Sequence, residues 1–292
     1  MQNFPLVSVI CISHNHQDYI IEALNSVMNQ SYPNIELIIT DDCSSDKSQQ
    51  IIKNWLNDYP NVLFIPNEVN LGNIKTFNNA AKKATGDYFV DLAADDILLE
   101  NCIQRQIETF ISSKFKNTGL VYANIELFDD NNNFISIYYD ETENPQSGDV
   151  YEMVISRSTK ICSVASMIKK EVFETVGYYD ENLAYEDLDL WVRASRLYNF
   201  EYIPEVLAKK RELSTSLSAH FLKRNNKRTK LLHQSTLLIF EKIISLNRTK
   251  REHKAVLGRM RFEMFKFIYS RSFNSLFKLL LLAIKTKKRT YF

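Results

Sequence analysis

The sequence predicts an α/β protein with a mainly parallel central sheet, helices on both faces, and a basic helical extension in its last seventy residues. Two observations predict this class. Short, apolar, β-branched runs alternate with helical patterns through the first hundred residues, an order typical of parallel strands joined by crossover helices. The 292-residue chain is also 45% hydrophobic and 12% aromatic, which is ample for a packed core and argues against disorder.

The alternation can be followed element by element from the N-terminus. Apolar runs bounded by turn residues predict strands over 6–13, 35–40, 62–66 and 86–94. Apolar residues at helical spacing predict helices over 19–30 and 73–84, and one more through Ile51, Ile52, Trp55 and Leu56, for which Ser44, Ser45 and Asp46 offer N-caps. This order predicts the mainly parallel sheet.

Polar residues follow three of the predicted strands, each time at the carboxyl end. They are, in chain order, His14 and Asn15, Asp41 and Asp42, and Asp95 and Asp96. Ligands of open α/β sheets bind outside the carboxyl ends of the strands. We therefore expect these three sets to share one pocket.

Asp95 and Asp96 stand side by side, and adjacent carboxylates repel one another. One interpretation is a turn that exposes both acids and caps a helix starting near Ile97. The other is a bound divalent cation, which prefers hard carboxylate oxygens. The segment alone favours the turn.

The loop after the first strand, "SHNHQD", contains no glycine, which excludes both a dinucleotide fingerprint and a P-loop. An acidic rim can still hold a diphosphate through a bridging divalent metal. Asp42 could accept hydrogen bonds from a ribose or a base. His14 could lie flat against a base, or it could be a solvated loop residue.

Five stretches together resemble the family-2 glycosyltransferases, in order and at the expected spacing, over about residues 5–218. They read "VSVICISHN", "SVMNQSYPNIELIITDDCSSD", "NLGN", "ATGDYFVDLAADD" and "VGYYDENLAYEDLDLWVRASR". The resemblance implies the GT-A fold and an inverting, hexosyltransferase-type reaction of bacterial polysaccharide or glycolipid assembly. It implies a nucleotide-diphosphate sugar donor, expected to be a UDP-sugar, and a saccharide or lipid-linked acceptor.

The same resemblance assigns roles around the donor. His14, Asn15 and Asp42 would line the base and ribose site. Asp95 would contact the donor sugar or ribose, and Asp96 would hold Mg²⁺ or Mn²⁺.

A second acidic centre opens the stretch "YEDLDLWVRASRLY", in which Leu188, Trp191, Val192 and Ser195 share one face of a predicted helix. Taken alone, Glu186 and Asp187 would stabilise the helix dipole by ~0.3–1 kcal/mol. By resemblance, Asp187 would be the general base and Glu186 would bind acceptor hydroxyls. Lys75 and Arg211 are candidate diphosphate partners, or solvated surface residues.

Two positions depart from the family pattern. Ala93 stands where the family often has the first Asp of its Asp-x-Asp-Asp stretch, so a metal is expected to have fewer protein ligands. Leu213, in "RELSTSLS", stands where members often have a histidine, and His220 is only a weak substitute for it as a metal ligand.

The formal net charge of +1 conceals a strong asymmetry. Residues 221–292 contain 19 Lys or Arg and 3 Asp or Glu, whereas residues 1–220 contain 17 and 32. We therefore predict a catalytic domain over 1–220 and a basic amphipathic helical extension over 221–292. The extension could bind an anionic membrane surface or pack on the acidic domain. Its many Leu, Ile and Phe residues argue against a nucleic-acid partner.

The four cysteines lack metal-ligand spacing, and Cys11 and Cys102 fall in apolar runs, so reduced thiols are expected.

No signal-type segment and no run of about 20 apolar residues occurs. We expect a cytoplasmic protein, peripheral at the inner face of the cell membrane if the extension binds lipid. Two other functions stay open. One is a nucleotidyltransferase, although such an enzyme would need a Gly-rich basic loop after the first strand to bind a triphosphate. The other is a non-catalytic sugar-nucleotide-binding assembly protein.

Overall fold

A computed structural model of the chain describes residues 4–143, 145–157, 161–213 and 220–291. The chain divides into two compact units, each made of three segments. The segments of the first unit are Met1–Gly148, Cys162–Tyr178 and Tyr198–Glu212, and those of the second are Asp149–Ile161, Tyr179–Leu197 and Leu213–Phe292. The basic C-terminal residues thus share a unit with two earlier segments.

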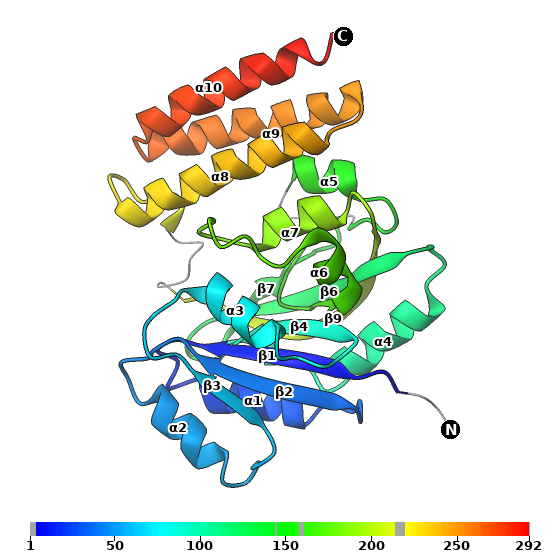
Figure 1. Cartoon of the computed structure of the whole chain (residues 1–292), viewed down its shortest axis with the longest axis vertical. Helices are drawn as coiled ribbons and strands as arrows, with labels where there is room; N and C mark the ends of the chain where they lie inside the picture. Colours follow the sequence, from blue (N-terminus) through cyan, green and yellow to red (C-terminus); the bar gives the residue numbers. More distant parts are fainter. Residues whose placement is uncertain (1–3, 144, 158–160, 214–219, 292) are drawn as a thin grey trace. The chain divides into compact units, whose positions relative to one another are not determined.

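The described residues of the first unit form a nine-stranded sheet of order β3-β2-β1-β4-β8-β6-β9-β5, with β7 paired to β6 (Figure 1). Its strands are β1 (Val7–Ser13), β2 (Ile35–Asp41), β3 (Leu63–Pro66), β4 (Tyr88–Ala93), β5 (Ile97–Leu98), β6 (Thr118–Phe128), β7 (Phe134–Ile137), β8 (Ser166–Lys169) and β9 (Asn199–Arg211). Its helices are α1 (Ile20–Met28), α2 (Ser48–Trp55), α3 (Asn73–Ala81), α4 (Cys102–Ser112) and α6 (Lys170–Val176).

The first half of this sheet is parallel, as the sequence predicts. β1 pairs in parallel with both β2 and β4, and β2 pairs in parallel with β3. Helices α1 and α2 connect strands in one direction along the sheet, whereas α3 connects β3 back to β4 in the other direction. Because such crossovers are right-handed, α1 and α2 lie on one face of the sheet and α3 on the other (Figure 1). Every residue of β1 is buried, as expected of a strand covered on both faces.

Antiparallel pairs enter the sheet at β8, so its second half is mixed. β8 lies antiparallel to β4 and to β6, and β6 lies parallel to β9. β5 pairs antiparallel with β9, with Ile97 opposite Lys209. The residues after Asp96 therefore form a strand, and the next helix, α4, begins only at Cys102. The helix predicted near Ile97 is wrong.

The N-cap of α2 lies one residue after the last of the predicted N-caps. It is Lys47, and Asp46, the residue before Lys47, accepts a hydrogen bond from the Ser48 N–H at 2.9 Å. All four cysteines are free, and Cys11 and Cys102 are fully buried, which confirms their assignment to the core.

The second unit is helical, and its described residues form α5 (Tyr151–Ser156), α7 (Asp187–Ala194), α8 (Lys227–Leu246), α9 (Lys250–Tyr269) and α10 (Phe273–Lys288). The last three lie side by side (Figure 1). They confirm the helices predicted after residue 220. α5 packs against α9 and α7 against α8. None of the described helices combines the length and the hydropathy that crossing a bilayer requires.

Charged side chains fasten the early segments of this unit to the late ones. Lys242 Nζ on α8 lies 2.6 Å from carboxylate oxygens of both Asp180 and Asp189. Arg196 pairs with Glu252 at 3.0 Å, and its guanidinium lies 3.4 Å above the ring of Tyr151. The second unit is therefore one folded body in which α7 and the C-terminal helices depend on each other.

Candidate functional site

The carboxyl ends of β1, β2 and β4 meet at one edge of the sheet, where the sequence predicts a pocket. The register sets Ser13 beside Asp41 and Ile12 beside Ala93. Because the chain passes outward from β1 to β2 and β3 and then returns past β1 to β4, the direction of the connections reverses between β1 and β4, and a crevice between the loops after these two strands is expected. His16 Nε2 lies 4.0 Å from Asp95 Oδ2 across it. The three predicted polar sets therefore lie along one edge of the sheet.

Asn15 links the loops that follow β1 and β2. Its φ of 59° lies in the left-handed region, which Asn tolerates better than most residues. Its backbone N–H donates to Ser44 Oγ at 2.8 Å, and its Oδ1 accepts from the Ser45 N–H at 2.8 Å. The Oδ1 of Asn15 is thus engaged within the protein, and its amide nitrogen has two hydrogens, of which one can point to His14 Nε2 and the other can meet a ligand.

The ring of His14 is exposed but held in a fixed direction. Its Nδ1 lies 2.9 Å from the carbonyl oxygen of Asp42, so this nitrogen carries the proton and donates it. Its Nε2 is 3.3 Å from the Asn15 amide nitrogen, which can then donate to it. An oriented, exposed imidazole offers a flat surface on which a base could stack.

Asp42 is buried, at 3% exposure, and its carboxylate organises the loop before α3. Its Oδ1 accepts from the Leu71 N–H at 2.7 Å and from Asn67 Nδ2 at 3.0 Å. Its Oδ2 accepts from the Gly72 N–H at 2.8 Å, where the φ of +82° suits glycine. The stretch "NLGN" has no role assigned from sequence, and here it forms the loop before α3 that Asp42 holds in place.

Asp96 is also buried, with 5% exposure, and Asp95 beside it is partly exposed. Burial, and then the neighbouring charge of Asp95, raise the pKa of Asp96 well above its usual value. The interpretation of this pair as an exposed, helix-capping turn is therefore wrong. Two adjoining carboxylates, one of them buried, suit a divalent cation.

A cation held by Asp95 and Asp96 would need further ligands from outside this pair. Within the described ranges, no group of three or more His, Cys, Asp or Glu side chains is placed to hold a metal ion. Mg²⁺ commonly takes only one or two carboxylates and completes its shell with phosphate oxygens and water. The pair therefore fits a cation shared with a phosphorylated ligand.

Arg211 at the end of β9 is a structural residue rather than the diphosphate partner or solvated residue expected from the sequence. Its side chain is 2% exposed. The guanidinium donates to Glu22 at 2.8 Å and to Asn132 Oδ1 at 2.7 Å, and it lies over the rings of Tyr19 and Phe128. Lys75, by contrast, is exposed on α3, and its diphosphate role stays a prediction.

The second acidic centre lies in the second unit. α7 begins at Asp187, and the predicted apolar face is buried. Asp187 Oδ1 accepts from the Leu188 N–H at 2.6 Å, and the residue is partly exposed, as is Glu186. Asp189 is fully buried and bound by Arg193 and Lys242. Of these two aspartates, only Asp187 can therefore reach a substrate.

His220 and the stretch "RELSTSLS" bear on the missing histidine ligand. His220 belongs to the second unit, and burial lowers the pKa of its ring. Leu213 is described, but residues 214–218 of the stretch lie outside the described residues. His220 thus keeps the standing of a weak candidate that the sequence indicates for it.

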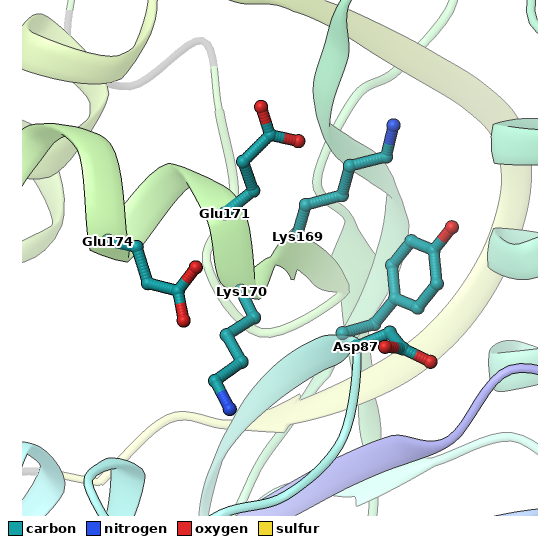
Figure 2. Close-up of a pocket in the computed structure, with 6 residues that line it drawn as sticks. Asp87, Lys169, Lys170, Glu171 and Glu174 are labelled. Atoms are coloured by element: carbon teal, nitrogen blue, oxygen red, sulfur yellow. The ribbon is translucent and has the colours of Figure 1, made fainter.

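A separate hollow of about 420 Å³ lies at the amino end of β4, the opposite end of that strand from Asp95 and Asp96. Figure 2 shows its charged side chains, and the lining residues are Asp87, Tyr88, Lys169, Lys170, Glu171 and Glu174. Three carboxylates against two ammonium groups would repel a diphosphate. This hollow is therefore a poor donor site.

Comparison with known proteins agrees with this geometry. The family model described as glycosyl transferase family 2 matches residues 8–177. An uncharacterized glycosyltransferase of Rickettsia typhi is 32% identical over 212 residues, which are 71% of this chain and 64% of that protein. The chain thus spans less than two thirds of that relative's length. TuaG of Bacillus subtilis, named for teichuronic acid biosynthesis, is 36% identical over 119 residues, or 39% of this chain and 46% of TuaG.

Solved structures extend the likeness in fold. TarS 1–349 of Staphylococcus aureus in complex with UDP-GlcNAc has a TM-score of 0.67 at 17% identity, covering 91% of this chain and 74% of TarS 1–349. The mannosyltransferase PcManGT of Pyrobaculum calidifontis, in complex with GDP-Man and Mn²⁺, has a TM-score of 0.65 at 16% identity, covering 96% and 74%. The fold is thus the predicted GT-A fold with a helical C-terminal region. With a family model that matches more than half of its residues, the chain belongs to glycosyl transferase family 2.

Proposed function

We propose that the protein transfers a sugar from a nucleotide-diphosphate sugar to an acceptor hydroxyl, with inversion at the anomeric carbon. Residues 1–220 form the catalytic domain in this proposal, and 221–292 form its helical extension. The observation that carries it is the meeting of three polar sets at the carboxyl edge of β1, β2 and β4, in a chain of this family.

The donor is proposed to lie along this edge. The base stacks on the oriented ring of His14, and the amide nitrogen of Asn15 donates to it. Asp42, buried against the loop before α3, accepts from the ribose with the lone pairs that its protein donors leave over. A UDP-sugar is the proposed class, in line with the UDP-GlcNAc bound by TarS.

Asp95 and Asp96 are proposed to hold Mg²⁺ or Mn²⁺ together with the donor diphosphate, in line with the complex of PcManGT with GDP-Man and Mn²⁺. When bound, the cation supplies positive charge next to the departing nucleotide diphosphate. The backbone N–H of Arg211 fixes Asp96, and Asp95 also reaches toward the donor sugar or ribose.

Asp187 is proposed as the general base. As the acceptor oxygen forms its bond to the anomeric carbon, the bond from that carbon to the diphosphate oxygen breaks. The hydroxyl proton passes to the Asp187 carboxylate, and Glu186 accepts hydrogen bonds from other acceptor hydroxyls. Attack from the face opposite the leaving group inverts the anomeric centre. A cell-surface polysaccharide or glycolipid is the proposed product, which the likeness to TuaG supports.

Thermal unfolding with UDP-, GDP- and dTDP-sugars, each with and without Mn²⁺, tests the donor and metal assignments. A true donor at one hundred times its Kd should stabilise the protein by about 2.7 kcal/mol, and only with the cation present. Asp96→Asn keeps the shape of the side chain and should lose that metal-dependent part. If no nucleotide sugar stabilises the protein, or if Asp96→Asn responds as the parent does, the proposal is wrong.

A further inference from the structure

The face of α10 that points away from its packing partners is apolar. It consists of Phe273, Phe277, Leu280, Leu281 and Ile284, which are between 42% and 63% exposed. These positions recur at the spacing of one helix face. We call them the α10 apolar face. Large exposed apolar patches of this kind mark interaction surfaces.

The opposite side of the same helix is buried within the second unit. Ser275, Leu279 and Thr286 are buried, and α10 packs against α8 and α9. The α10 apolar face is therefore not the side by which the helix is held in the fold. In the second half of α9, Phe262, Phe265 and Tyr269 are also exposed.

Positive charge borders the α10 apolar face. Lys278 and Lys285, one heptad apart, are exposed along one edge of it, and Lys287 and Lys288 are exposed at its end. Residues 264–292 contain seven Lys or Arg and no Asp or Glu. Such a helix, apolar on one side and edged by lysines, has the pattern of a helix that lies in the plane of a membrane.

We propose that the α10 apolar face docks the protein onto an anionic lipid surface. The aromatic and aliphatic side chains enter the boundary between headgroups and acyl chains, and the flanking lysines contact lipid phosphates. The axis of α10 lies parallel to the surface, because its apolar side chains recur along one face from Phe273 to Ile284.

Charge favours a lipid surface over a second copy of the chain as the occupant. In a symmetric dimer through this face, each copy would present the same patch to the other. The lysines of both copies would then lie close together with no acidic residue of 264–292 to pair them. An anionic membrane supplies the opposite charge across the whole face, each lysine strengthening binding about fivefold.

Co-sedimentation of the full chain with lipid vesicles tests the proposal. Vesicles of phosphatidylglycerol and phosphatidylcholine should bind the protein, vesicles of phosphatidylcholine alone should bind it at least tenfold less, and added salt should weaken binding. Phe273→Ser with Phe277→Ser, and separately Lys278→Gln with Lys285→Gln, should each reduce binding at least tenfold. All four side chains are exposed, so these variants keep the fold.

A matched control removes one exposed apolar and one exposed basic side chain elsewhere. Ile111→Ser with Lys53→Gln changes exposed residues of α4 and α2 in the first unit and should bind vesicles as the parent does. The proposal is overturned if the α10 variants bind as tightly as the parent, or if neutral vesicles bind equally well. It is also overturned if sedimentation velocity shows a parent dimer that the α10 variants dissociate while no vesicle binds.

Discussion

The backbone N–H of Arg211 donates a 3.0 Å hydrogen bond to Oδ1 of Asp96, across the antiparallel pairing of β9 with β5. The Arg211 side chain continues from there, and its Nε lies 3.3 Å from the Asp95 carbonyl oxygen. One residue at the end of the last strand thus positions both acids of the proposed cation site, although it lies 115 positions away in the chain.

Arg211→Met should destabilise the first unit. The substitution leaves the amide oxygen of Asn132 and the carboxylate of Glu22 without their buried donor, but Glu22 is half exposed and can be solvated. We therefore expect a loss of about 1–3 kcal/mol, measured as a lower urea midpoint. Arg211→Lys keeps the charge but not the forked geometry, so it should recover only part of the loss. A midpoint unchanged in both variants would contradict the role given to Arg211.

Asp42→Ala should loosen the loop before α3 as well as weaken donor binding. Two backbone N–H groups, of Leu71 and Gly72, lose their acceptor, at a cost of about 1–3 kcal/mol for each one left unsatisfied. Urea unfolding measures the stability part. Asn67→Ala is the matched control because it removes only one donor to the same carboxylate. If Asp42→Ala is no less stable than this control, Asp42 does not organise the loop.

Asp187→Asn separates a chemical role of this residue from a structural one. The amide oxygen can still accept from the Leu188 N–H, so the start of α7 should be preserved. Losing a general base should lower turnover by ~10²–10⁴-fold with little change in donor affinity. Transfer assays and donor titration on the same preparation measure both quantities. Near-normal turnover in a folded variant would leave Asp187 with a helix-start role only and would favour a non-catalytic binding protein.

The Lys242–Asp180 ion pair should make the free energy of unfolding fall as the solution becomes more acidic. Burial alone would raise the pKa of Asp180, but the hydrogen bonds from Lys242 and Asn182, together with the charge of Lys242, outweigh burial and lower the pKa from 3.8 to about 2. The carboxylate therefore contributes stability at pH values above 3.8, and the contribution is lost as the pH falls toward 2. The pair is partly exposed, so we expect about 1 kcal/mol or less. Urea midpoints between these pH values should fall less steeply for Asp180→Asn than for the parent.

The parallel half of the sheet and the edge it presents could be predicted from the sequence because their signals are local. An apolar run such as Val7–Ser13 is buried on both faces, and each predicted strand lies within two residues of an observed one. The polar residues at each strand end are then brought together by the fold itself. The start of α7 at Asp187 was predictable for the same reason, since its apolar face follows the helical period.

The mixed half could not be predicted, because its pairings join residues far apart in the chain. Nothing near Ile97 marks Lys209 as its partner, so the acids before it looked like a helix cap. The burial of Arg211 was missed for a related reason: arginine is usually exposed, and its partners come from three other segments.

The three-part makeup of the second unit has a consequence for the protein while it is still on the ribosome. Tyr151 of α5 donates its hydroxyl to Asn247, and α5 packs against α9, so α5 emerges nearly a hundred residues ahead of these partners. At a synthesis rate of ~5–20 residues per second, its buried side chains wait for about 5–20 s. By then the last strand of the first unit, β9, has already been made. The nascent chain thus carries one unit with all its strands, while α5 and α7 contact each other but still lack α8 and α9, which makes these two helices the natural targets of chaperones during its synthesis.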